Sequence, residues 1–490
     1  MAVKTIDILG HADFGGSFRK CRRAPGLAAF YAAVRSVRSK NPDGTLLLDA
    51  GDNFCRQLWN GAEVAEGLAL IGTDAMTLGN HEFDFGRDFL ERAIAASRFP
   101  VLCANVREKE TGLPVRGTAP TALFERRGIR IGVVGVTTEY TPYMVEASAF
   151  APYAVSSAAD ACRKHIPALR DAGAQIVVVL AHEPFYIGEN GVSGELIDLL
   201  SALGGLGVDA MIGGHIPGDY AGVVGGTAVV KGGFGGVSLP HIALDYDTGA
   251  GRVTARRCEV IDVAGGACGE NSEAVGEFVR RVTGPYDYFF TEPLGTLTAD
   301  MPMRLSAESP LGDFFADCVR ETAGTQFAYM NATSAGRALA AGTLTRESVL
   351  DAMGFNDPIL TARATGAQLR ALFELVYEPA RFGNNAGLIH AGFTAEIDNA
   401  APAGRKVVSL RLPDGAPIER DAVYTVATSR YMASGGNDTG SCARALAWHD
   451  TGVKMNDSLF ANIRARGTIE PPAPGRLVLH GRPENDNAPY

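Results

Sequence analysis

The chain has 490 residues, which is too long for one hydrophobic core and predicts two domains of ordinary size. Hydrophobic residues make up 46% of it and charged residues 20%, as in soluble globular proteins. The net charge of −10 argues against a general nucleic-acid binder, but it does not exclude a small anionic substrate, because a metal ion reverses the local field.

Three further features bear on the compartment. The chain has no run of about 18 apolar residues, so no membrane-spanning helix is predicted. The eight cysteines include no Cys-x-x-Cys pair, which argues against a zinc site built from thiolates. The N-terminus reads directly into a strand and lacks the pattern of a signal peptide. We therefore expect a cytoplasmic protein, or a periplasmic one if a signal peptide has been trimmed.

Apolar segments of strand length alternate with segments of helical spacing along the first half of the chain. Strands that alternate with helices indicate an α/β domain with helices packed on its sheets. The expected strands are residues 3–9, 45–48, 99–104, 129–136, 175–180 and 208–212, and the expected helices are residues 25–37, 64–71 and 158–172.

Polar residues follow several of these strands at once. Ligands of open α/β sheets bind beyond the carboxyl ends of the strands, so side chains far apart in sequence can converge there. A single histidine at such a place is best interpreted as structural, but two Asp and one Asn beside several histidines favour a metal site. The candidate ligands are Asp13, Asp52, Asn80, His182 and His215.

The most specific stretch is Gly-Asn-His-Glu-Phe-Asp at residues 79–84. The carboxamide of Asn80 can bind a metal through its oxygen, and the imidazole of His81 can donate or accept a proton. Asp84, three residues later, can fix the tautomer of that imidazole. The alternative is a strand end followed by a turn with a solvated histidine.

These motifs, together with Gly51-Asp52 and Gly214-His215, resemble those of the calcineurin-like metallophosphoesterases. With its C-terminal half included, the chain resembles the 5′-nucleotidase/UDP-sugar hydrolase family. The resemblance implies an N-terminal four-layer α/β/β/α metallophosphoesterase domain (residues 1–265), a helical connector (266–292), a C-terminal α+β nucleotide-binding domain (293–482) and a loose tail (483–490). It also implies hydrolysis of a nucleotide or related phosphate ester by a metal-bound water, in a cleft that the second domain closes.

The resemblance also assigns roles to residues. Asp52 would bridge two divalent ions, which would be zinc, manganese or iron. Asn80, His182 and His215 would complete one ion's site, and Asp13 would bind the other ion. His81, oriented by Asp84, would assist the leaving oxygen.

The second ion's site departs from the family pattern. The family's Asp-x-His reads Asp13-Phe14-Gly15 here, and its His-x-His reads His215-Ile216-Pro217, so two imidazoles are missing from one site. One or two ions therefore remain possible. Residues near the motifs that could replace the lost ligands are His11, Cys21, Cys55 and Asp219, although each of them taken singly is better interpreted as a bystander. His11 is attractive because it lies two residues before Asp13, and such residues face the same side of a strand.

The second half of the chain carries motifs that resemble the family's nucleotide-binding domain. Phe355 and Tyr431 would sandwich the nucleobase, although both are also consistent with ordinary core aromatics. Ala307 and Gly336 stand where the family has arginines, which weakens the case for ordinary AMP hydrolysis. The substrate-binding candidates are Asn331, Phe355, Tyr431, Asn437 and Asp438.

The sequence thus favours a metal-dependent phosphoric ester hydrolase, and two other functions stay open. One is a degenerate, non-catalytic homologue that binds a nucleotide or a metal. The other is a sister hydrolase of a sulfur-containing or cyclic diester substrate. The expected partner is a small phosphate ester, most simply a nucleotide, with no nucleic acid and no membrane.

Overall fold

The computed structural model describes residues 2–481 apart from 22–23, 55–58, 189–190, 217, 266–271, 305–306, 337, 354, 378–386 and 437–438. The chain forms two compact units, the N-terminal unit (Met1–Pro285) and the C-terminal unit (Tyr286–Tyr490). The division falls within the predicted connector, and the finer domain limits stay a prediction. Several residues named above lie outside the described residues: Cys55, Pro217, Asn437, Asp438 and the tail 483–490.

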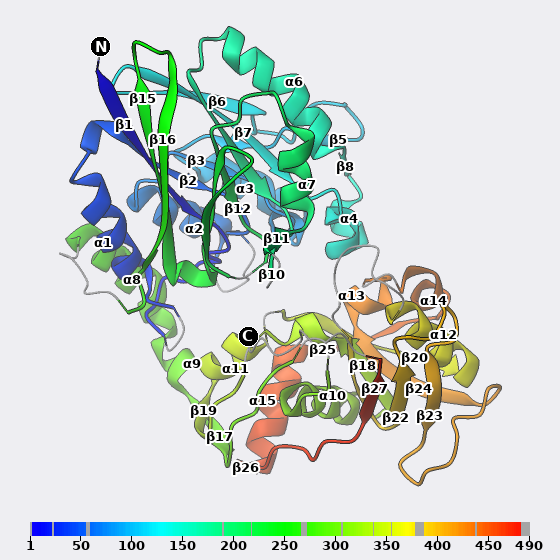
Figure 1. The fold of residues 1–490 in the computed structure, drawn as a ribbon. Helices are drawn as coiled ribbons and strands as arrows, with labels where there is room; N and C mark the ends of the chain where they lie inside the picture. The colour runs from blue at the N-terminus through cyan, green and yellow to red at the C-terminus, as the bar shows by residue number, and fades with distance from the viewer. Residues whose placement is uncertain are drawn as a thin grey trace. The chain divides into compact units, whose positions relative to one another are not determined.

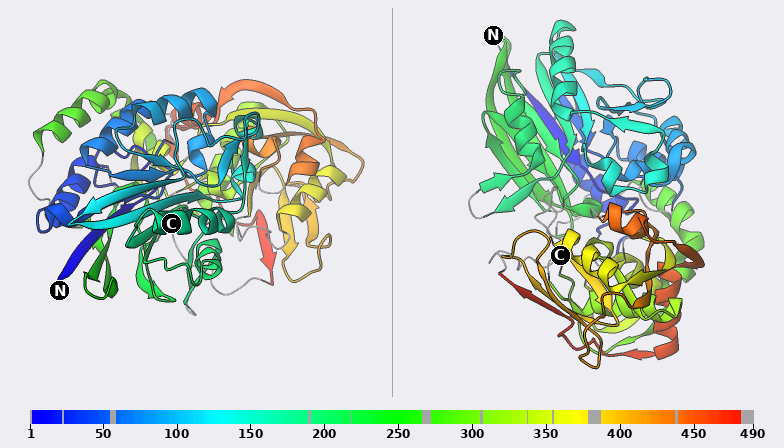
Figure 2. Two further views of the ribbon diagram at one scale, coloured as in Figure 1. Left: turned by 90° about the horizontal axis from the view of Figure 1, so that it is seen from above. Right: turned by 90° about the vertical axis from the view of Figure 1, so that its right-hand side faces the viewer.

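Two six-stranded sheets form the centre of the N-terminal unit (Figure 1). The first has the order β16-β15-β1-β2-β3-β4, in which β1 to β4 are parallel. Its strands are β1 (Val3–His11), β2 (Thr45–Asp49), β3 (Ala75–Thr77), β4 (Val101–Leu102), β15 (Ser238–Asp247) and β16 (Arg252–Asp262). The antiparallel pair β15 and β16, green in Figure 2, runs beside the blue β1.

The second sheet has the order β13-β14-β12-β9-β7-β6, and β14, β12, β9 and β7 are parallel. Its strands are β6 (Thr121–Arg126), β7 (Ile129–Thr137), β9 (Ile176–His182), β12 (Ala210–Gly213), β13 (Tyr220–Val224) and β14 (Thr227–Lys231). Two small pairs are β5 (Val106–Glu108) with β8 (Tyr153–Val155), and β10 (Tyr186–Gly188) with β11 (Gly191–Ser193).

Helices cover both outer faces of this sandwich. Strand residues that alternate inward, such as Ile8 and Leu48 from one sheet and Leu180 and Ile212 from the other, form the core between the sheets. A second core lies between the outer face of the second sheet and α6 and α7. The helices are α1 (Leu27–Arg38), α2 (Gly61–Leu70), α3 (Gly86–Ala96), α4 (Thr141–Met144), α5 (Ala147–Phe150), α6 (Ala158–Asp171), α7 (Glu195–Ala202) and α8 (Glu273–Thr283). The predicted four-layer α/β/β/α class is confirmed.

The C-terminal unit is α+β and has its own cores. Its sheets have the orders β19-β17-β26, β21-β18-β24-β20-β25 and β23-β22-β27. The strands are β17 (Pro293–Leu297), β18 (Phe327–Asn331), β19 (Gly342–Thr345), β20 (Pro358–Thr365), β21 (Leu388–Ala391), β22 (Thr394–Asp398), β23 (Val407–Arg411), β24 (Val423–Ser429), β25 (His449–Lys454), β26 (Thr468–Ile469) and β27 (Leu477–His480). The helices are α9 (Asp287–Thr291), α10 (Pro310–Ala323), α11 (Arg346–Ala352), α12 (Gly366–Val376), α13 (Arg430–Ala433), α14 (Gly440–Arg444) and α15 (Met455–Arg466).

The C-terminal unit is confirmed as α+β, with helices such as α10 packed on the central sheet. In the described part of the chain, no helix combines the length and the apolar composition needed to cross a membrane.

Candidate metal centre

The candidate ligands of the N-terminal unit meet beyond the carboxyl ends of parallel strands from both sheets. Asp52 follows β2 and Asn80 follows β3, while His182 ends β9 and His215 follows β12. The Nε2 atom of His182 lies 2.9 Å from Oδ2 of Asp52. The Nδ1 atom of His215 lies 2.8 Å from Oδ1 of Asn80 and 3.3 Å from Nε2 of His182.

These spacings fit a single divalent ion. Ligand atoms that sit about 2.0–2.2 Å from a zinc ion are separated from one another by about 3 Å. Asp52, His182 and His215 have ligand atoms within 4.8 Å of one another, and no second such group of His, Cys, Asp or Glu occurs among the described residues. Two imidazole nitrogens and two oxygens make a donor set suited to zinc, manganese or iron.

Neighbouring main-chain groups orient these ligands. The Nδ1 atom of His182 lies 2.7 Å from the carbonyl oxygen of Ala50, and donation to that oxygen leaves Nε2 for a metal. The main-chain N–H of His81 donates to Oδ1 of Asp52 at 2.8 Å. One of the hydrogen bonds that hold the Asp52 carboxylate therefore comes from the main chain of His81 and does not depend on the His81 side chain.

Backbone strain is concentrated at the predicted ligands. Asp13, Asp52 and His215 have φ angles of 54°, 60° and 77°, and the only other described non-glycine residue with positive φ is Arg127. A non-glycine residue in this region costs about 1–3 kcal/mol and persists where the surrounding structure imposes it. The positive φ values turn the chain out of the strand direction at these three residues.

Glycines in the motifs permit the close approach of the ligands. A Cβ atom at Gly79 would lie 2.2 Å from Oδ1 of Asp52, and one at Gly214 would lie 2.8 Å from Nδ1 of His182. Any larger residue at either position would displace a ligand. This explains in physical terms why glycine precedes Asn80 and His215.

His81 and Asp84 form the expected pair beside this donor set. Nδ1 of His81 lies 2.8 Å from Oδ2 of Asp84, and the His81 side chain keeps 24% of its surface exposed. Burial alone would lower the pKa of His81, but the charges of Asp84 and Asp52 raise that pKa to about 10. His81 therefore carries a proton at neutral pH and is accessible to a ligand.

The remaining ionisable groups of the centre have strongly shifted pKa values. Although burial opposes it, the adjacent Asp52 carboxylate raises the pKa of His182 to about 9. Burial and the charge of His182 lower the pKa of His215 to about 3, so its imidazole is neutral. Only a neutral imidazole binds a metal, so an ion entering this site displaces the His182 proton.

The half of the centre around Asp13 contains fewer ligands. Oδ2 of Asp13 accepts a hydrogen bond from the main-chain N–H of His215 at 3.0 Å. Burial raises the pKa of the Asp13 carboxyl to about 7, and the Asp52 charge adds to this rise. Asp219 accepts a hydrogen bond from the Ser238 hydroxyl at 2.5 Å. Neither Asp13 nor Asp219 belongs to the cluster of ligand atoms around His182.

The structure does not place His11 as a replacement ligand. Strand alternation does not extend to Asp13, because Asp13 has a positive φ and lies beyond the end of β1. The His11 ring instead packs against Phe14 and Phe30, and its Nε2 lies 3.6 Å from Asp49. Burial lowers the pKa of His11 to about 3, so this histidine is a neutral core residue.

Glu82 has a role that the sequence analysis missed. This fully buried carboxylate accepts four main-chain N–H groups: those of Gly79 (2.6 Å) and Asp52 (2.9 Å) on Oε2, and those of Asn53 (2.6 Å) and Phe54 (2.9 Å) on Oε1. It thereby fastens the loop that carries Asp52 to the loop that carries Asn80. No signal in the sequence indicated this role, because the partners of Glu82 are main-chain groups.

The described substrate-binding candidates gather at one end of the central sheet of the C-terminal unit. Asn331 ends β18, Phe355 precedes β20, and Tyr431 lies in α13 directly after β24. Strands β20 and β24 are antiparallel neighbours that pair Ile359 with Ser429. The segments that carry the two aromatics therefore adjoin the sheet at the same end of these strands. Their contact with a nucleobase stays a prediction.

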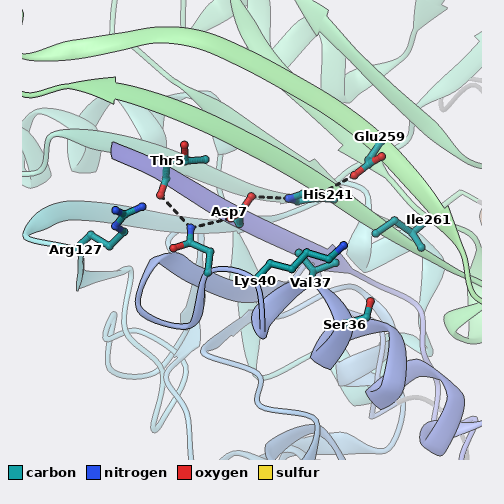
Figure 3. A pocket seen from close by; sticks show the side chains of 10 residues that line it. Thr5, Asp7, Ser36, Val37, Lys40, Arg127, His241, Glu259 and Ile261 are labelled. Atoms are coloured by element: carbon teal, nitrogen blue, oxygen red, sulfur yellow. Dashed lines mark hydrogen bonds and ion pairs between the residues drawn. The ribbon is translucent and has the colours of Figure 1, made fainter. Parts of the chain in front are cut away.

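A separate surface cavity of about 610 Å³ lies beside β1, β15 and the end of α1 (Figure 3). Its lining contains none of the predicted site residues. His241 bridges the carboxylates of Asp7 and Glu259, both at 2.8 Å, and Asn41 donates to Asp7 at 2.8 Å. Since the only cluster of potential metal-ligand atoms among the described residues is that of Asp52, His182 and His215, this cavity is not an alternative metal site.

The missing imidazoles lead to a prediction about metal content. Replacing Gly15 and Pro217 by histidine, as Gly15→His with Pro217→His, should raise the bound metal by about one ion per chain, because two carboxylates alone hold an ion weakly. Elemental analysis of both proteins after dialysis against dilute manganese measures this. Two equally tight ions in the parent chain would contradict the prediction.

Comparisons with known proteins agree with this geometry. The family model for calcineurin-like phosphoesterase matches residues 8–219, which contain every predicted metal ligand and the His81–Asp84 pair. The N-terminal unit is thus a metallophosphoesterase domain. The model for the 5′-nucleotidase C-terminal domain matches residues 293–442. With both domains in this order, the chain belongs to the 5′-nucleotidase family.

Individual relatives are distant. The chain is 25% identical over 511 residues to a 5′-nucleotidase of Diplobatis ommata, covering 93% of this chain and 85% of the relative. It is 25% identical over 457 residues to endonuclease YhcR of Bacillus subtilis, covering 88% of this chain but only 35% of that longer protein. The fold matches a 5′-nucleotidase precursor from Thermus thermophilus with a TM-score of 0.83, 22% identity and coverage of 98% and 100% of the two chains.

Proposed function

We propose that this chain is a metal-dependent phosphoesterase that hydrolyses the phosphate ester of a nucleotide or a related small molecule. One observation carries the proposal. A complete four-ligand donor set, Asp52, Asn80, His182 and His215, adjoins a histidine–carboxylate pair in a domain of the metallophosphoesterase family. A degenerate binding protein would have no need to keep both the donor set and the histidine–carboxylate pair.

The ligand set and the His81–Asp84 pair have different roles in this proposal. The four ligands hold a divalent ion, which supplies Lewis acidity at the phosphate when bound. His81 holds a proton that it can donate to the leaving oxygen, since the charges of Asp84 and Asp52 keep the imidazole protonated. Asp84 also fixes the orientation of the His81 ring through the 2.8 Å contact at Nδ1.

The nucleotide is proposed from the C-terminal domain and the relatives. The matched domain model is that of 5′-nucleotidases, and the relative from Diplobatis ommata is named for that activity. Phe355 and Tyr431 supply aromatic faces on which a base can stack, a contact that tolerates many bases. The polar candidates for binding the sugar and phosphate are Asn331, Asn437 and Asp438, of which the last two lie outside the described residues.

The direct test is a substrate panel assayed on protein loaded with manganese, zinc or ferrous iron. The panel contains nucleoside 5′-monophosphates, a simple phosphate monoester, a cyclic nucleotide and a sulfur-containing ester. We expect turnover of a nucleoside monophosphate, and metal content is measured on the same samples. Turnover of the cyclic diester or the sulfur ester alone would identify a sister hydrolase. Bound metal without turnover of any ester would identify a non-catalytic homologue.

A further inference from the structure

Lys231 is a buried lysine beside the metal centre for which the proposed function has assigned no role. It ends β14 and is only 1% exposed. Buried ammonium groups are rare and costly unless they are paired. Its ammonium has one hydrogen-bond acceptor among the described residues, the main-chain carbonyl of Phe185 at 3.4 Å. The ammonium also lies 5.5 Å from the centre of the Phe185 ring. An ammonium carries three donors, so this environment satisfies it only in part.

The sheet brings Lys231 to the edge of the metal centre. In the parallel pair of β12 and β14, Lys231 stands beside Gly213, two residues before His215. A Cβ atom at Gly213 would lie 3.8 Å from both Cβ and Cδ of Lys231, so the lysine stem passes over that glycine. The strand end that carries Lys231 is therefore adjacent to the strand end that carries a metal ligand.

The chain after Lys231 is joined to Asp13 directly. The N–H of Gly235 donates to the main-chain carbonyl of Asp13 at 2.9 Å, and the N–H of His215 donates to the Asp13 carboxylate at 3.0 Å. Burial lowers the pKa of Lys231 to about 8, and the charges of Asp13 and Asp219 oppose this fall. Asp13 is the same residue that is left without imidazole partners by Gly15 and Pro217.

We propose that Lys231 is the built-in cation of the second half of this centre, supplying beside Asp13 the positive charge that a second metal ion would bring. The inference rests on the proposed function, because the charge matters where a phosphate is bound. In this proposal the centre contains one tightly bound metal ion and one fixed ammonium group. A fixed ammonium also opposes the entry of a further cation, since like charges repel strongly where water is excluded.

The test is metal binding, measured by isothermal titration of metal-free protein with manganese and by elemental analysis. We expect one tight ion in the parent chain. Lys231→Met should tighten the binding of a second ion by about tenfold or more, because it removes the opposing positive charge. Metal binding of Lys231→Gln is measured as well. Its carboxamide is uncharged but can still donate to the Phe185 carbonyl, so this variant tests the proposal if Lys231→Met does not fold.

Lys406 provides the matched control. It is also buried, at 4% exposed, and its ammonium donates to the carbonyl of Asn399 at 2.7 Å in the C-terminal unit. Lys406→Met deletes a buried ammonium of the same kind and should leave metal binding as in the parent. If Lys231 merely stabilised the fold, its variants would melt earlier while binding metal like the parent, and that result would overturn the proposal.

The outcome is separable from that of the proposed function because no substrate is present. A second ion that tightens in the Lys231 variants supports the fixed-cation role even if no phosphate ester is turned over. Turnover of a nucleotide by a parent chain that binds two equally tight ions would support the function and overturn the role of Lys231.

Discussion

His81→Ala is expected to lower turnover by about 10²–10⁴-fold while metal content stays at the parent level. The imidazole is the group that donates a proton to the leaving oxygen, so its removal acts on the chemical step. The metal site should persist, because the bond to the Asp52 carboxylate comes from the His81 main-chain N–H, which alanine retains. Turnover and metal per chain are measured on the same preparation.

The control for this variant is His449→Ala. His449 is an exposed histidine of β25 in the C-terminal unit, outside the proposed machinery, and its loss should change neither turnover nor metal content. Asp84→Asn should lower turnover as well, because the carboxylate charge that keeps His81 protonated is lost. Unchanged turnover in His81→Ala would show that another group serves the leaving oxygen.

Much of the N-terminal unit could be predicted from one physical rule. A buried parallel strand reads as a short apolar run, and its carboxyl end lies at the edge where ligands bind. The polar residue that follows each run is then a candidate for one common site. That reasoning predicted that Asp13, Asp52, Asn80, His182 and His215 converge. In the structure the ligand atoms of the last four meet, and Asp13 lies outside their cluster. Their metal-binding roles stay predictions.

The errors and omissions came from features that pattern cannot express. His11 stayed a candidate ligand because strand alternation was carried past β1, where the positive φ of Asp13 breaks it, and the preferred interpretation of His11 as a bystander agrees with the structure. Lys231 was missed because a lysine at the end of an apolar strand is usually solvated, and only the tertiary structure buries it. In the C-terminal unit, family resemblance alone singled out Phe355 and Tyr431. No periodicity distinguishes a stacking aromatic from a core aromatic.

Glu82 illustrates a third kind of gap between sequence and structure. It stands inside the most specific motif of the chain, yet its partners are main-chain N–H groups of residues 52–54, about thirty positions earlier. Main-chain groups carry no residue identity, so such contacts leave no pattern in the sequence. The geometry of the motif therefore depends on a residue outside the predicted ligand set.

Glu82→Gln is accordingly expected to damage the fold and the metal site together. Whichever way the carboxamide turns, two of the four N–H groups now at 2.6–2.9 Å face an NH₂ group instead of an oxygen. Each buried donor left without an acceptor costs about 1–3 kcal/mol. We expect the N-terminal unit to lose about 2 kcal/mol or more of stability, and metal content to fall because the Asp52 and Asn80 loops are no longer fastened together.

Glu63→Gln is the matched control, since it makes the same change at a carboxylate that accepts one N–H. Glu63 accepts the N–H of Asn60 at 3.0 Å in the capping box of α2, at the surface, and glutamine serves that position as well. Calorimetry and metal analysis on both variants should show a Tm lowered by about 4 °C or more and a loss of bound metal in Glu82→Gln alone. A Glu82→Gln protein with the parent's Tm and metal content would show that the two loops are held by other contacts.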